Sequence, residues 1–87
     1  MSTPAGADAF TYQVQVGAFT RSEDAEAQRA KLAMQGFSAK VTEREQAGRM
    51  VYRVRLGPFD TKAEADALQA RLQGAGIEGQ LVRVQKP

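Results

Sequence analysis

The chain has 87 residues and a formal net charge of +2, which gives it the length of one domain and only a weak preference for anionic partners. It contains no cysteine and no histidine, so disulfides, thiol catalysis, thiolate metal sites and the commonest acid–base catalyst are excluded. No run of about 18 apolar residues occurs, so the sequence holds no candidate membrane-spanning helix.

The two ends of the chain are expected to lie outside the folded part. Residues 1–9 are predicted to be a disordered linker or an expression remnant, and residues 86–87 a short polar tail. The domain is therefore placed at residues 10–85.

Alternation predicts the first strand, at residues 12–16. Its two faces carry different side chains, with Tyr12, Val14 and Val16 on one and Gln13 and Gln15 on the other. A period of two with one apolar side is typical of a half-buried strand.

A helix is predicted to follow this strand. Thr20 suits the N-cap position, and with Glu23 it fits a capping box. Gly36 suits the left-handed position just beyond the helix, where Phe37 can fold back on Leu32. The helix is therefore expected to end in a Schellman motif.

Three further strands are predicted, at about residues 38–43, 51–56 and 79–84. Residues 44–49 are polar and contain glycine, so they are expected to form an exposed hairpin loop. In the third strand, alternation separates Val51, Arg53 and Arg55 from Tyr52, Val54 and Leu56.

Internal repetition is the strongest feature of the sequence. Residues 12–41 match residues 52–81 without a gap, at an offset of 52 − 12 = 40. The matched pairs include Tyr12 with Tyr52, Val14 with Val54, Gly17 with Gly57, Phe19 with Phe59, Leu32 with Leu72 and Gly36 with Gly76. We therefore expect a second helix of the same kind with Asp60 as its N-cap, and the four repeated aromatic residues in the core. At both strand-end glycines we expect a bulge or a close backbone approach.

The predicted order is β-α-β-β-α-β, a split unit of the ferredoxin or RNP-like α+β class. Right-handed crossovers give a four-stranded antiparallel sheet in the order 4-1-3-2, with two helices on one face. The other face of the sheet is expected to be open, and open sheet faces are common binding surfaces in this architecture.

Glutamine and arginine side chains are expected on that open face. The central strands supply Gln13, Gln15, Val51, Arg53 and Arg55, and the outer strands add Lys40, Thr42, Gln80 and Val82. Glutamine offers hydrogen-bond donors and an acceptor, and arginine a planar fork of donors. The same residues are also compatible with a merely solvated sheet face.

The sequence resembles the SPOR (sporulation-related repeat) family. The resemblance is carried by VQVGAF at residues 14–19, the alanine-rich helix that ends at Gly36-Phe37, and YRVRLGPF at residues 52–59. It implies a non-catalytic module that binds peptidoglycan glycan strands lacking stem peptides, in a periplasmic parent protein at the division septum.

The resemblance also implies site residues. Gln15 matches a glycan-binding glutamine of the family, and Arg53 matches an arginine with the same role. Ala18 and Val51 depart from a serine and a stacking tryptophan of other members, and Val82 matches an apolar residue unless its register slips by one. The expected glycan site comprises Gln13, Gln15, Ala18, Val51, Arg53, Arg55 and Val82.

Two other functions use the same open face. An RNA-binding module shares the element order, although the expected face lacks aromatic residues for stacking bases. A protein–protein adaptor also fits. We expect no enzymatic activity, no cofactor, no metal, no nucleic acid, no direct membrane contact and a monomeric state.

Overall fold

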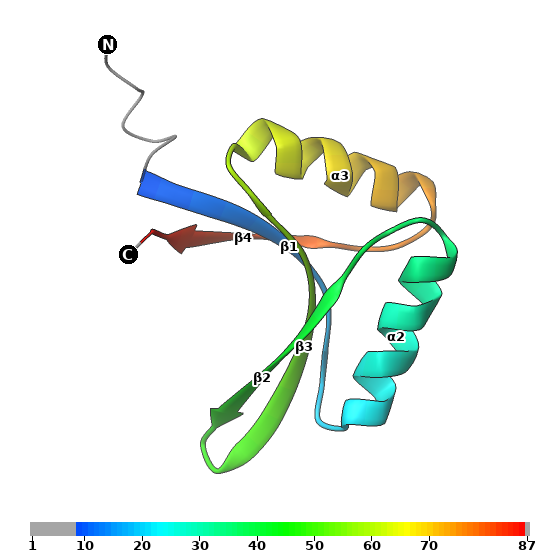
Figure 1. The fold of residues 1–87 in the computed structure, drawn as a ribbon, viewed down its shortest axis with the longest axis vertical. Helices are drawn as coiled ribbons and strands as arrows, with labels where there is room; N and C mark the ends of the chain where they lie inside the picture. The colour runs from blue at the N-terminus through cyan, green and yellow to red at the C-terminus, as the bar shows by residue number, and fades with distance from the viewer. Residues whose placement is uncertain (1–8, 87) are drawn as a thin grey trace. The chain divides into compact units, whose positions relative to one another are not determined.

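The computed structural model describes residues 9–86; nearly all of the predicted linker and Pro87 lie outside them. Figure 1 shows the elements in chain order: β1 (Phe10–Phe19), α2 (Ser22–Met34), β2 (Lys40–Gln46), β3 (Arg49–Phe59), α3 (Lys62–Gly74) and β4 (Gln80–Gln85). The strands form one antiparallel sheet in the order β2-β3-β1-β4. The predicted fold class and strand order are confirmed.

The chain divides into two compact units. The central unit is residues 15–56, and the terminal unit joins residues 9–14 with residues 57–86. The central unit buries Ala25, Leu32, Phe37, Val54 and Leu56, and the terminal unit buries Val14, Ala65 and Leu72. Six of these eight residues are repeat partners at the offset of 40, so the repeat in the sequence is a repeat of core positions.

Both helices end as predicted. Gly36 follows α2 with φ +89°, its N–H donates to the Ala33 carbonyl at 3.1 Å, and the Phe37 N–H donates to the Leu32 carbonyl at 2.9 Å. Gly76 (φ +77°) ends α3 with the equivalent bonds. These are the two bonds of a Schellman motif, and Phe37, at the position of the motif's apolar residue, is buried.

The predicted N-caps are wrong. Both helices begin later than expected, and the N-cap residues are Arg21 and Thr61 in place of Thr20 and Asp60. The Thr61 hydroxyl accepts a hydrogen bond from the Glu64 N–H at 3.2 Å and donates to its carboxylate at 3.0 Å. Arg21 makes no such bond, because its guanidinium group carries hydrogen-bond donors and no acceptor.

The four repeated aromatic residues (Tyr12, Phe19, Tyr52 and Phe59) are half-buried and do not belong to the fully buried core. Phe19 instead covers its neighbour Gly17, where an added Cβ would lie 2.7 Å from the ring. Phe59 covers Gly57 in the same way, with its ring atoms 3.2 Å from an added Cβ. Another part of the backbone comes close only at Gly57, where the Tyr12 carbonyl oxygen lies 3.0 Å from an added Cβ. At Gly17 the close atoms are those of a side-chain ring, so the predicted backbone approach is found at one glycine of the two.

The loop between β2 and β3 is shorter than predicted. The strands continue to Gln46 and Arg49, which pair, and only Ala47 and Gly48 connect them. Both connecting residues have positive φ, 51° and 79°, as a tight two-residue hairpin turn requires. Two residues in this conformation are enough to connect the strands, so strand pairing continues up to the turn. The other polar residues expected to be a loop are therefore strand residues.

Candidate functional site

The pairing of β2 with β3 places the candidate site. The register joins Lys40 to Arg55, Thr42 to Arg53, Arg44 to Val51 and Gln46 to Arg49. Residues directly opposite each other in an antiparallel pair share a face, and so do alternate residues along each strand. These eight side chains therefore share one face of the hairpin, which we name the basic face.

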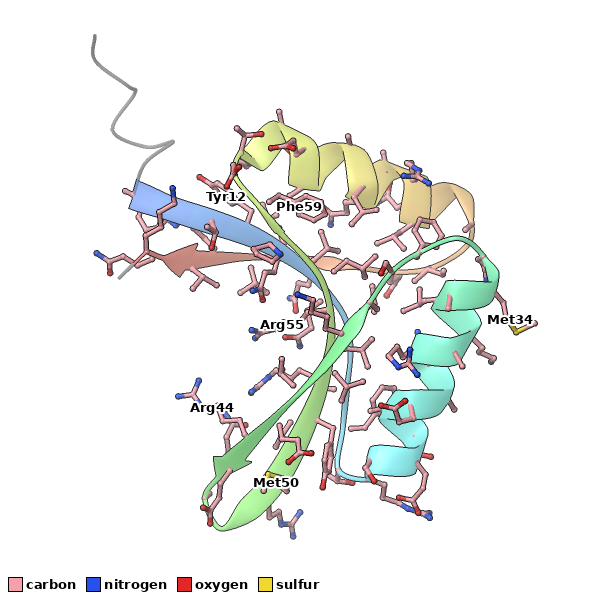
Figure 2. All side chains as sticks on the ribbon, in the orientation of Figure 1. Tyr12, Met34, Arg44, Met50, Arg55 and Phe59 are labelled. Carbon is pink, nitrogen blue, oxygen red and sulfur yellow. The ribbon has the colours of Figure 1, made fainter. Side chains whose placement is uncertain are left out.

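The other face of the hairpin is the core face. Val41 pairs with the fully buried Val54, Glu43 with Tyr52 and Glu45 with Met50. Figure 2 shows Arg44 and Arg55 projecting from the side of the hairpin that faces away from α2. The basic face is thus the uncovered side of the central unit's hairpin, and the acidic residues of β2 lie on the opposite side.

Gln15 of β1 joins the basic face through a side-chain hydrogen bond. The Arg55 Nε–H donates to Gln15 Oε1 at 3.2 Å, and both side chains are partly buried. The bond directs the guanidinium of Arg55, while the Gln15 amide nitrogen adds further donors to the same surface.

Positive charge accumulates on this surface. It holds five cations, namely Lys40, Arg44, Arg49, Arg53 and Arg55, out of 12 in the whole chain. Burial lowers the pKa of Arg55 from its usual value, and the positive charges of Arg53 and Arg44 lower it further. Arginine stays protonated at any pH a protein survives, so the consequence is mutual repulsion, which a bound anion would relieve.

Ion pairs also occur on the helices of residues 9–86. They join Arg21 to Glu23, Arg29 to Glu26 and Lys62 to Asp66, each within a helix or at its start. None of these three pairs includes Lys40, Arg44, Arg49 or Arg53.

The predicted site residues fall in both units. Gln15, Val51, Arg53 and Arg55 lie together in the central unit, all half-buried, and Ala18 is exposed further along β1. The other two predicted residues, Gln13 and Val82, belong to the terminal unit and are half-buried there.

The register of Val82 follows from a contact inside the terminal unit. The guanidinium of Arg83 lies 4.3 Å from the centre of the Phe10 ring, so these side chains share a face. Alternation along β1 puts Phe10 on the face of the fully buried Val14. Val82 therefore points to the opposite, non-core face, as expected, and the one-residue slip does not occur.

Sequence reasoning missed Arg44 and Arg49 as parts of this surface, because it placed them in a loop. A signal was present: Lys40, Thr42 and Arg44 continue the alternation of β2 without a break. However, the positions that alternate with these residues hold no apolar side chain beyond Val41, so hydrophobic periodicity does not identify residues 43–46 as a strand.

Other kinds of site find no support in the described residues. Within residues 9–86, no group of three or more acidic side chains is placed to hold a metal ion. Neither helix of that part of the chain is long and apolar enough to cross a membrane. The basic face is therefore the candidate functional site.

The SPOR domain profile matches residues 8–83, and the chain belongs to the SPOR family. Three solved structures share its fold. The peptidoglycan binding domain of the B. subtilis cell wall lytic enzyme CwlC has a TM-score of 0.73 and 28% identity, with 97% of this chain and 98% of that chain covered.

The second is the RlpA SPOR domain from Pseudomonas aeruginosa, with a TM-score of 0.70, 30% identity and coverage of 85% of this chain and 99% of that chain. The third is an exported protein from Burkholderia pseudomallei, with a TM-score of 0.71, 26% identity, and 85% of this chain but only 16% of that chain covered. No curated protein matches the chain.

Proposed function

We propose that this chain is a non-catalytic module that binds peptidoglycan, and that it selects glycan strands lacking stem peptides. Membership of the SPOR family supports the proposal, as does the likeness to a CwlC domain that binds peptidoglycan. The observation that carries it is the pair Arg53 and Arg55 on an uncovered sheet face, with Arg55 held by Gln15.

The chemistry of the ligand explains the selectivity. Removal of a stem peptide exposes the lactyl carboxylate of N-acetylmuramic acid, which a guanidinium binds in a charge-assisted and often bidentate hydrogen bond. Intact peptidoglycan has an amide at this position and a bulky peptide beyond it. The basic face therefore attracts the stripped strand, and the peptide excludes the intact one.

The neutral residues serve the sugar itself. Gln15 donates to hydroxyl and acetamido groups, and Val51 contacts an apolar face of a pyranose ring. Ala18 leaves room for the strand beside Gly17. We assign Gln13 and Val82 as further glycan contacts on β1 and β4.

A pull-down with purified sacculi tests the proposal. Amidase digestion of the sacculi is expected to increase the amount of domain bound, and Gln15→Ala and Arg53→Ala are expected to abolish the increase. Arg29→Ala, which removes an arginine from α2, is the control and should bind like wild type. Equal binding to digested and undigested sacculi by all four proteins would refute the proposal.

The finer biological setting is also proposed. Residues 31–40 resemble the helix end and second strand of the SPOR domain in the cell division protein FtsN, so we infer a periplasmic parent protein at the division septum. Within it, residues 10–85 would act as a monomeric domain. A fluorescent fusion of these residues exported to the periplasm should collect at the septum, and a uniform distribution would contradict this assignment.

Single-stranded RNA is the weaker candidate for the basic face. Its positive charge suits a phosphate backbone. However, RNA-recognition modules of this element order stack bases on aromatic residues of the central strands, and Tyr52 lies on the core face here. The surface offers charge without a stacking platform.

A further inference from the structure

The cations of the basic face form a continuous row that extends well past the proposed carboxylate-binding pair. Arg44 lies directly opposite Val51, so it is diagonal to Arg53 on one side and to Arg49 on the other. Diagonal neighbours in an antiparallel pair are about 7–8 Å apart, within reach of long side chains. From Arg55 to Arg49 the row runs six residues along β3, which is roughly 20 Å at about 3.4 Å per residue.

The distal part of this row is exposed. Arg44 and Arg49 are exposed, whereas Arg53 and Arg55 are half-buried. Their strand neighbours Glu43 and Glu45 cannot reach them, because alternation directs both carboxylates to the other face. No ion pair in residues 9–86 includes Arg44 or Arg49. The hairpin end therefore concentrates positive charge where an anion from solution can approach.

A row of this length is too long for one carboxylate to contact all of its cations. A stripped glycan strand carries one lactyl carboxylate on every second sugar, so an extended strand presents carboxylates at regular intervals. A strand that lies along the hairpin and places one carboxylate at Arg53 and Arg55 brings another toward the hairpin end.

We infer that Arg44 and Arg49 form a second anion subsite, which binds a neighbouring carboxylate of the same stripped glycan strand. This inference rests on the proposed function. It also fixes the direction of the ligand, along β3 toward the β2–β3 turn, and it makes affinity depend on the number of repeating units in the strand.

Binding of amidase-stripped glycan fragments of two lengths, measured by calorimetry, tests the subsite. One fragment is a single disaccharide and the other contains several. Arg44→Gln with Arg49→Gln is expected to weaken binding of the long fragment by about tenfold, the size of one or two exposed charge contacts, and to leave the single disaccharide unchanged. Thermal unfolding of each variant confirms that it is folded.

Two variants control for net charge. Arg29→Gln removes one positive charge from α2, half the change made by the double variant, and Glu45→Gln removes an acid from the opposite face of the same hairpin. Both should bind the long fragment like wild type. If Arg29→Gln weakens binding as much as the double variant does, or if Glu45→Gln strengthens it equally, overall charge is responsible and the subsite is refuted.

The remaining outcomes separate this inference from the proposed function. If the double variant binds long fragments like wild type while Arg53→Ala does not, the second subsite is refuted and the proposed function stands. If wild type binds neither fragment, the proposed function fails. If a single-stranded RNA oligomer displaces the long fragment at lower concentration than free glycan does, the row binds phosphodiesters and the inference is overturned.

Discussion

Gln15 and Arg55 occupy the same position in the two halves of the sequence repeat, and their side chains are joined by a hydrogen bond of 3.2 Å. Their strands, β1 and β3, are neighbours in the sheet. Two arginines at these positions could not form this hydrogen bond, because a guanidinium only donates. The two halves of the repeat differ at this position, and the difference supplies the acceptor and the donor of the bond that directs Arg55 on the basic face.

Gln15→Glu separates the hydrogen bond from the charge of the surface. A carboxylate still accepts from Arg55, and more strongly, so thermal stability should stay the same or rise. The new negative charge repels an anionic strand, so affinity for stripped glycan should fall by tenfold or more. The same substitution at Gln73, which is exposed on α3, should change neither quantity. Tight glycan binding by Gln15→Glu would contradict a carboxylate-binding face.

Ala47→Asn should stabilise the domain. Ala47 has φ 51° in the two-residue turn, a conformation that disfavours alanine and that asparagine tolerates. We expect the free energy of unfolding to rise by about 0.5–1 kcal/mol in urea denaturation. Ala47→Val, with its branched side chain, should lower it. If asparagine and valine have the same effect, backbone conformation at this turn does not limit stability.

Alanine at the two strand-end glycines should have unequal effects. At Gly17, an added Cβ meets only the edge of the Phe19 ring, which can move, so we expect a loss of about 1–2 kcal/mol. Phe19→Leu in the same chain should recover part of it. At Gly57, φ is +119° and the Tyr12 carbonyl oxygen lies 3.0 Å from the added atom, so the loss should be larger and not recoverable in this way. Equal melting temperatures for the two single variants would contradict this reading.

The helix starts offer a matched comparison. Thr61→Ala removes an N-cap hydrogen bond and should lower the free energy of unfolding by about 1 kcal/mol, whereas Thr20→Ala should have little effect. Arg21→Thr supplies α2 with the acceptor that it lacks and should raise stability by about 0.5–1 kcal/mol. Chemical denaturation of the three variants measures all of these changes. A large loss from Thr20→Ala would place the cap of α2 one residue earlier.

Local signals in the sequence were sufficient for the C-terminal ends of both helices, but not for the helix starts or for the burial of the four repeated aromatic residues. Gly36 and Gly76 indicated the Schellman motifs because a left-handed residue followed by an apolar one is a local requirement. The N-caps were harder, since Thr20, Asp60 and Thr61 all carry suitable oxygens. Which of them caps a helix depends on where the preceding strand lets the first turn begin.

The candidate site also has one part that could be predicted from the sequence and one part that could not. Alternation in β3 was enough to put Arg53 and Arg55 on one face with Val51, away from Val54. Arg44 and Arg49 could not be placed, because polar strand residues at the end of a hairpin have no hydrophobic pattern. Their position depends on the register set by the turn.

By itself, the sequence determined the repeated β-α-β unit, the aliphatic positions that are buried, and the resemblance that led to a glycan-binding hypothesis. These features follow from hydrophobic periodicity and backbone preferences, which act between residues close in the chain. Only the tertiary structure decided that Arg55 bonds to Gln15, 40 residues away, and that five cations share one face. Such proximity arises from strand pairing, and pairing register is a property of the folded sheet and its turn.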